Sequence, residues 1–99
     1  MGPLSDIFET DDAFWVVVAL PGVDLSGVEV SFAARRLAVR CRRALPAIAR
    51  QAVVHRLELL VGDFERVVEF SADRSSGGYE LGEVEAIHGS LVLRVRKVR

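Results

Sequence analysis

Few residues of this 99-residue chain are of the types that carry out chemistry, and their spacing forms no familiar catalytic motif. His55 and Glu58 stand about one helical turn apart, so a helix would direct both at one metal ion, but no third ligand accompanies them. The chain also has no G-x-S-x-G motif, no glycine-rich phosphate loop and no cysteine pair for zinc. We therefore predict no catalytic, cofactor-binding or metal-binding residues, and a protein that is not an enzyme.

Cys41 and the glutamates Glu83 and Glu85 have structural interpretations. Cys41 falls at an inward position of an expected strand, where a small apolar residue is typical. As the only cysteine it cannot form an internal disulfide, which favours a reducing compartment and predicts a cytoplasmic protein. Glu83 and Glu85 alternate outward on a strand, which indicates a solvated face rather than an acid–base pair.

Basic residues gather in two clusters, at 35–43 and at 94–99, which raises the question of nucleic-acid binding. The whole chain balances 13 Lys and Arg against 14 Asp and Glu, for a formal net charge of −1, and neither cluster holds an aromatic platform for bases. We interpret these side chains as outward charges that keep strand edges from aggregating. No nucleic-acid partner is expected. No membrane partner is expected either, because no apolar run approaches the roughly 20 residues of a membrane span.

The chain is 51% hydrophobic and 27% charged, which predicts a folded domain rather than a disordered one. Its length leaves room for a single core. At this size folding hides only about 60–70% of the surface of the chain, so burial against other chains would add stability. Composition alone does not explain why so small a domain should be this apolar.

Alternation with a period of two dominates the sequence and predicts strands. In residues 14–20 both faces are apolar, so this strand is expected in the middle of a sandwich or beneath another chain. The turn residues Pro21-Gly22 end it. Further strands are predicted at 28–33, 36–42, 64–70, 82–87 and 90–95. His88-Gly89 fits a two-residue turn between the last two.

Together these strands and short turns predict an all-β fold, an antiparallel sandwich of about seven or eight strands. Arg66 shares a strand face with Phe64, Val68 and Phe70. A buried arginine needs a carboxylate partner, so we expect this strand to lie near an edge or an interface where Arg66 meets one.

The segment 44–62 has two possible structures. Its apolar residues follow helical spacing, and Pro46 stands where a first helical turn accepts proline. The residues that also alternate as in a strand are Val53, His55, Leu57 and Leu59. Helix and strand both remain open. A connection of this length is unusual in so small a domain, and its apolar content predicts that it is covered by something.

Residues 6–40, DIFETDDAFWVVVALPGVDLSGVEVSFAARRLAVR, resemble the start of the alpha-crystallin domain of small heat-shock proteins. The likeness lies in an apolar strand ending in L-P-G-V, followed by a V-x-V strand and an R-L-x-V strand. His55-Arg56 with residues 62–66, GDFER, is similar to the H-R…G-x-F-x-R segment of that family. Residues 89–91, GSL, stand where its G-V-L motif falls, with serine in place of valine.

The resemblance implies an immunoglobulin-like sandwich over residues 5–97, with 1–4 a vector remnant or the stub of an N-terminal arm and 44–62 a long dimerisation loop. It implies an ATP-independent holdase chaperone of the stress response, of the bacterial or plant-like type, without a cofactor. In such members the long loop carries a strand that crosses to the neighbouring subunit and pairs with its N-terminal strand. A homodimer is therefore expected, with higher oligomers in the full-length protein.

The resemblance also implies two interaction sites. The dimer interface would comprise Ile7, Phe8, Val53, Val54, His55, Leu57, Leu59 and Arg66. A groove for clients or C-terminal tails would be lined by Val28, Val30, Phe32, Val84 and Ala86. Unfolding clients expose apolar segments and strand edges, so binding at such sites would compete with their aggregation.

Two other functions remain open from the sequence. A CS-domain-like co-chaperone has a related sandwich and would act as an adaptor that binds another chaperone, but a monomeric adaptor gains little from an apolar loop. A structural dimerisation module would pair with itself and protect no client.

Overall fold

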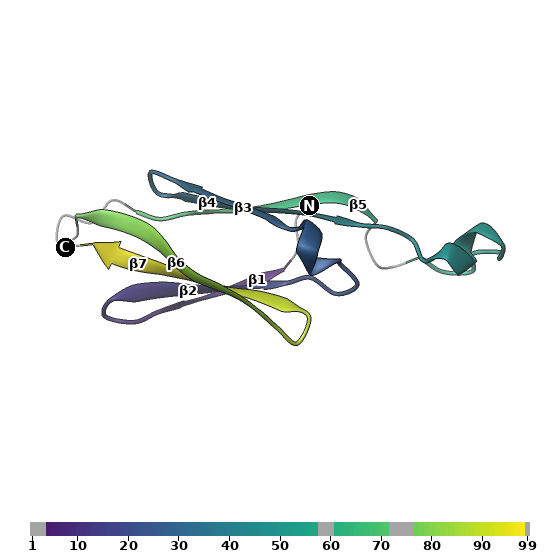
Figure 1. Ribbon diagram of the computed structural model, residues 1–99, viewed down its shortest axis with the longest axis horizontal. Coiled ribbons are helices and arrows are strands. Elements are labelled where there is room, and N and C mark those ends of the chain that lie inside the picture. Colours follow the sequence, from purple (N-terminus) through teal and green to yellow (C-terminus); the bar gives the residue numbers. More distant parts are fainter. Residues whose placement is uncertain (1–3, 58–60, 72–76, 99) are drawn as a thin grey trace.

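The computed structural model describes residues 4–57, 61–71 and 77–98, which form seven antiparallel strands in two facing sheets (Figure 1). The strands are β1 (Ser5–Glu9), β2 (Ala13–Ala19), β3 (Glu29–Ala33), β4 (Arg36–Arg43), β5 (Gly62–Glu69), β6 (Gly78–Ile87) and β7 (Ser90–Val98). The first sheet, sheet A, has the order β1-β2-β7-β6, and the second, sheet B, has the order β3-β4-β5. The predicted all-β antiparallel sandwich is confirmed.

The core lies between the two sheets and is built by alternation within the central strands. Each inward residue removes its side chain from water, which contributes about 1.5–3 kcal/mol per large apolar group. The buried residues are Val16, Val18, Leu20, Leu37, Val39, Cys41, Phe70, Leu91, Leu93 and Val95. At one end the ring of Phe70 packs 5.0 Å from that of Phe14 and 5.4 Å from that of Tyr79, measured between centroids. The inward position predicted for Cys41 is confirmed.

His88 and Gly89 form the turn between β6 and β7, as their sequence predicts. Both have a positive φ, 50° for His88 and 75° for Gly89. Two consecutive left-handed residues are typical of the tight hairpin turn whose twist matches that of its strands. This turn fixes the pairing of the two longest strands of sheet A.

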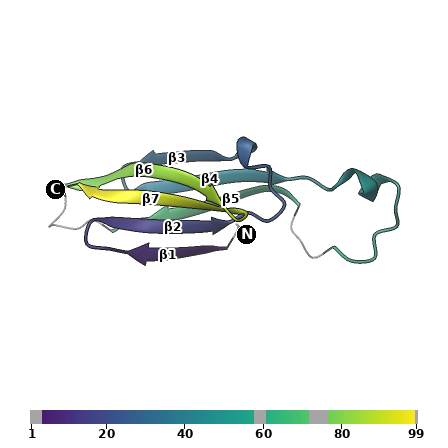
Figure 2. The same ribbon diagram turned by 60° about the horizontal axis from the view of Figure 1, so that its bottom comes forward.

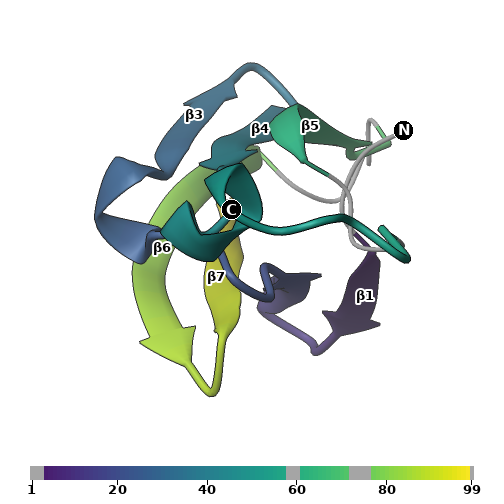
Figure 3. The ribbon, with the colours of Figure 1, turned by 90° about the vertical axis from the view of Figure 1, so that its right-hand side faces the viewer.

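Each sheet leaves two strands with a free edge. In sheet A these are β1 and β6, and in sheet B they are β3 and β5. Viewed from its end, the sandwich places β3 and β6 on one side and β1 and β5 on the other (Figure 3). The strand of Arg66, β5, is thus an edge strand, as expected for a strand that carries a half-buried arginine. That Arg66 meets a carboxylate stays a prediction.

Between β4 and β5 the chain leaves the sandwich and projects beyond its end (Figure 2). Residues 44–57, called the arm from here on, hold one short 3-10 helix, η2 (Ala47–Arg50), that begins after Pro46. The long helix and the strand predicted as alternatives are both absent from the arm in this single chain. A short helix without a packing partner is marginal in water, and a lone strand has nothing to pair with. Leu59 lies outside the described residues.

Candidate functional site

β1 is an edge strand with exposed apolar side chains. It pairs with β2 in the register Ile7↔Val16 and Phe8↔Trp15, and no other described strand pairs with it. Ile7 is 49% exposed and Phe8 is 56% exposed. Free backbone groups next to exposed apolar side chains form a template on which another strand can add.

The arm is the second segment with uncovered apolar side chains. Val53 is 82% exposed. The other exposed large apolar residues of the arm are Leu45, Ile48, Val54 and Leu57. His55 is exposed as well. So many apolar groups on a projecting segment are costly in water, which points to a partner surface.

Within one chain the arm and β1 do not cover each other. The arm extends past the end of the sandwich, whereas β1 runs along its side (Figure 2). The exchange predicted for Ile7, Phe8 and residues 53–57 therefore requires a second chain. Leu59, the remaining apolar residue of that prediction, lies outside the described residues.

Four of the five predicted groove residues occupy inward positions of the two edge strands on the other side, β3 and β6, and Val28 directly precedes β3. Val28, Val30 and Phe32 pack half-buried against the core. Val84 lies opposite Leu93 and Ala86 opposite Leu91, so both also face inward, yet Val84 is 43% exposed and Ala86 is exposed. β6 bulges between Leu81 and Val84, which bends this part of the edge strand.

Chemistry-bearing groups are scattered among the described residues. No three His, Cys, Asp or Glu side chains there gather around a possible metal position, and Glu58, weighed as a ligand beside His55, lies outside the described residues. Burial raises the pKa of the Cys41 thiol, which keeps it protonated and unreactive. Among the described residues there is also no helix of the length and apolarity that a membrane crossing requires.

On the outer face of sheet A, Arg94 holds a small charged cluster. Its guanidinium lies 3.2 Å from the carboxylate of Asp12 and 3.4 Å from that of Glu83, and its Cζ lies 5.5 Å from the centre of the Trp15 ring. A hydrogen bond from the Thr10 hydroxyl, and then Arg94, lower the pKa of Asp12. A backbone hydrogen bond of Glu83 itself, and then Arg94, lower the pKa of Glu83. The cluster covers part of an otherwise apolar surface.

That surface, called the outer patch from here on, consists of Phe8, Trp15, Val17 and Val92. Phe8 lies directly opposite Trp15, and Val17 directly opposite Val92, so the four side chains share one face of sheet A. The apolar outer side of residues 14–20 was the sequence signal for this patch. The contribution of Phe8 could not be foreseen, because the sequence does not give the register between β1 and β2.

Lys97 closes the end of the sandwich beside β1. Its ammonium group lies 2.6 Å from the carboxylate of Glu9, donates to the backbone carbonyl of Thr10 at 3.1 Å, and sits 5.2 Å from the centre of the Phe14 ring. These contacts hold the end of β1 and its turn to the C-terminal strand. The edge strand is therefore fixed in place before any partner arrives.

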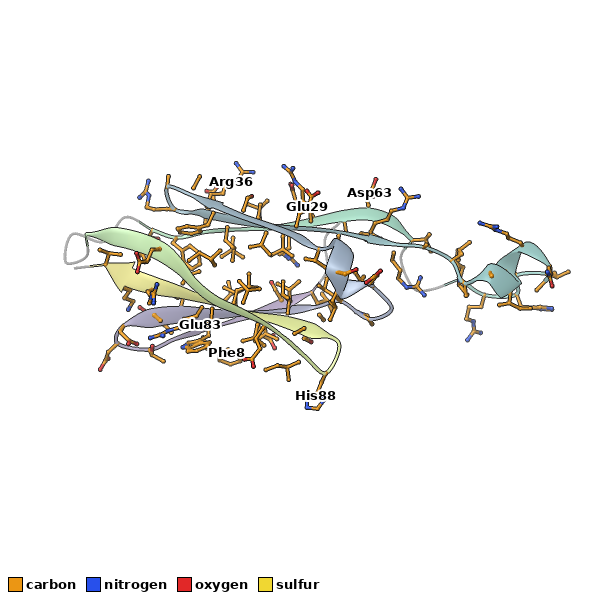
Figure 4. All side chains as sticks on the ribbon, in the orientation of Figure 1. Phe8, Glu29, Arg36, Asp63, Glu83 and His88 are labelled. Atoms are coloured by element: carbon orange, nitrogen blue, oxygen red, sulfur yellow. The ribbon has the colours of Figure 1, made fainter. Side chains whose placement is uncertain are left out.

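The outer face of sheet B is charged instead of apolar. Arg40 pairs with Glu65 across β4 and β5, and Arg42 lies 3.7 Å from Asp63. Figure 4 shows Arg36 and Asp63 pointing away from the sandwich on this side. These are the outward arginines that the sequence predicted as solvated charges, and they provide no apolar contact surface.

The chain matches no protein-family model and no curated protein. Solved structures match it over almost its whole length. A small heat-shock protein from Xylella fastidiosa has a TM-score of 0.77 at 25% identity, covering 100% of this chain and 88% of that one. The hspA protein of Xanthomonas axonopodis has a TM-score of 0.75 at 26% identity, covering 98% and 94%. Heat shock protein 16.0 from Schizosaccharomyces pombe has a TM-score of 0.81 at 22% identity, covering 100% and 68%.

The same two-sheet arrangement thus recurs in small heat-shock proteins, as the sequence motifs predicted. The bacterial or plant-like type stays a prediction, because these matches do not separate the types. This chain therefore has the fold of the alpha-crystallin domain, the β-sandwich of the small heat-shock proteins that it resembles.

Proposed function

We propose that the protein is an ATP-independent holdase, which binds unfolding proteins and keeps them from aggregating. The observation that carries this proposal is the pair of uncovered apolar segments, the arm and β1. A protein of this kind acts by burial alone. Unfolding clients expose apolar segments and strand edges, and both can be covered by a partner that offers the same.

The functional unit is a homodimer in which each arm crosses to the other chain and pairs with its β1. The exposure of Ile7 and Phe8 on β1, and of Val53, Val54 and Leu57 on the arm, supports this exchange. His55, Leu59 and Arg66 belong to the same proposed interface. Such an exchange is isologous, so two identical contacts form in one dimer. The proposed domain spans residues 5–97, with 44–62 as its dimerisation loop.

Clients bind along the edges of β3 and β6, on the side of the sandwich away from β1. The proposed contact residues are Val28, Val30, Phe32, Val84 and Ala86, which combine inward apolar side chains with a free strand edge. The single thiol, that of the buried Cys41, supports action in the cytoplasm.

Light scattering of a heat-unfolded client tests the proposal. Equimolar protein without ATP is expected to suppress the rise in scattering. Val84→Asp should weaken the protection by placing a charge on the proposed client site, whereas Ser31→Asp, on the outer side of the neighbouring strand β3, should not. Scattering that is unchanged by any amount of the unaltered protein would contradict holdase function.

A further inference from the structure

The open edge of β1 presents one charged and one apolar residue on the outer face of sheet A. Asp6 lies opposite Val17 and Phe8 opposite Trp15 in the register with β2. Asp6 is exposed and takes part in no ion pair among the described residues. A strand added at this edge would set one of its residues beside each of the two, with about 4.5–5.5 Å between Cβ atoms.

Charge is segregated between the two segments that lack a cover. Residues 4–12, which hold β1 and the following turn, contain four acidic residues and no basic one. They are Asp6, Glu9, Asp11 and Asp12. Residues 42–57, the arm and the end of β4, contain four basic residues and no acidic one. They are Arg42, Arg43, Arg50 and Arg56. Opposite charge steers two such surfaces together and suppresses wrong partners.

The order of residues in the arm then selects a register. An antiparallel strand that sets Arg56 beside Asp6 also sets Val54 beside Phe8, so a charge meets a charge and an apolar group meets an apolar group. A parallel strand with the same ion pair would set Glu58 beside Phe8 instead. A shift by one residue would move Arg56 to the inner side of the sheet, where a charge is costly.

We infer that the arm of a second copy pairs antiparallel with β1 in the register Arg56–Asp6 and Val54–Phe8, and that opposite charge selects it. This inference rests on the proposed dimer and adds to it the strand direction, the register and the source of selectivity. The rows of the outer face then continue across the subunit boundary as Val54–Phe8–Trp15 and Arg56–Asp6–Val17. Two such ion pairs form in the dimer, since each chain gives and receives an arm.

Exchanging the two charges within one chain tests the ion pair. Asp6→Arg and Arg56→Asp each bring like charges together, so each should raise the dimer dissociation constant about tenfold at low salt. The double variant restores opposite charges across the boundary and should return the constant to within about threefold of the unaltered value. Sedimentation velocity over a dilution series measures all four proteins.

The matched control uses another arginine of the same arm. Arg50→Asp combined with Asp6→Arg should not restore dimerisation, because Arg50 lies in η2 and outside the pairing segment. If this control recovers as fully as the exchange with Arg56, the arm acts only through its total charge and the register is wrong.

A disulfide tests the direction of the strand. In the pair Phe8→Cys and Val54→Cys, the antiparallel register brings the two cysteines of different chains within bonding distance, and a covalent dimer is expected on oxidation. Phe8→Cys with Glu58→Cys serves as the parallel counterpart and should give none. Cys41 is buried and does not compete. Cross-linking of the counterpart alone would overturn the antiparallel register.

The outcomes separate this inference from the proposal on which it rests. A wild-type chain that stays monomeric at every concentration removes the dimer and the register together. A wild-type dimer whose double charge variant is no tighter than the weaker single variant overturns the register alone.

Discussion

The two outer faces of the sandwich are made of the same kind of strand but differ in what they offer to water. On sheet B the central rows are ion pairs, such as Arg40 with Glu65, that satisfy each other across strands. On sheet A apolar side chains meet across strands, Phe8 beside Trp15 and Val17 beside Val92. The ion pairs of Arg94 cover only part of that surface. Figure 4 shows this contrast between Arg36 and Asp63 on one side and Phe8 on the other.

The difference indicates which side of the domain faces other chains. A row of ion pairs is stable in water and discourages contact with another sheet. An apolar row is unfavourable in water, and covering it lowers the free energy. The outer patch is also continuous with the free edge of β1, because Phe8 lies on that strand. In the proposed dimer, sheet B is covered by its own charged side chains, whereas sheet A is completed by a partner.

The largest expected effect comes from removing the apolar cover that the arm supplies. Val53→Glu with Leu57→Glu should convert the dimer to monomers, because each buried apolar side chain contributes about 1.5–3 kcal/mol. Leu59 belongs to the same proposed interface, and its replacement should add to the loss. Molar mass from light scattering on a size-exclusion column measures the change. Ile48→Glu, in η2 of the same arm, should leave the dimer intact, and a dimer that survives the first pair would place the interface elsewhere.

A smaller effect is expected when the outer patch itself is charged. Phe8→Glu should weaken the dimer and shift the emission of Trp15 to longer wavelength, since Trp15 loses its neighbour and its cover. The signal is specific because Trp15 is the only tryptophan of the chain. Ser31→Glu on the outer face of sheet B is the matched control and should change neither dimer nor emission. Equal effects of the two variants would contradict the claim that the outer face of sheet A, and not that of sheet B, contacts the partner.

Removing an ion pair should change stability less than charging the apolar surface does, and the loss should be larger on sheet A than on sheet B. Arg94→Met removes contacts to two carboxylates and to the Trp15 ring, so the melting temperature should fall by a few degrees. Arg40→Met removes one well-exposed pair on sheet B and should leave the melting temperature almost unchanged. Differential scanning calorimetry compares the melting temperatures of the two variants. A larger decrease for Arg40→Met than for Arg94→Met would contradict the greater contribution of the Arg94 contacts.

The smallest expected effect is on the loss of stability at acidic pH. The native pKa values of Asp12 and Glu83 are lowered, so their contribution to stability is complete above the unfolded pKa values, near pH 4, and is lost as the pH falls through the native ones. Asp12→Asn with Glu83→Gln should therefore flatten the decline of the melting temperature below about pH 4. An unchanged slope would show that these two carboxylates do not carry the acid sensitivity.

Much of the fold follows from local pattern. The alternation around Val16 and Val39 predicts the core, and the pair His88-Gly89 predicts its turn, because both depend on neighbours in sequence. The secondary structure of the arm could not be predicted in the same way. Its pattern fits a helix and a strand equally, and the arm of the single chain forms neither beyond η2. In the proposed dimer, the strand that would pair with the arm lies on another chain.

The candidate sites were predictable only in part. The exposure of Val53 and Leu57 follows from an apolar segment that one small domain cannot bury. The outer patch depends on the register that sets Phe8 beside Trp15, and register between strands is fixed by long-range packing. The exposure of groove residues such as Val84 likewise follows from the strand order, which places β6 at an edge, and not from the neighbouring sequence.

The central claim is that the uncovered apolar segments of this domain belong to an interface with a second copy. The molar mass of the unaltered protein in solution, followed by light scattering over a range of micromolar concentrations, tests it most directly. The expected value is twice the chain mass of 10.9 kDa, or a higher even multiple of it. A mass of 10.9 kDa at every concentration would contradict the claim.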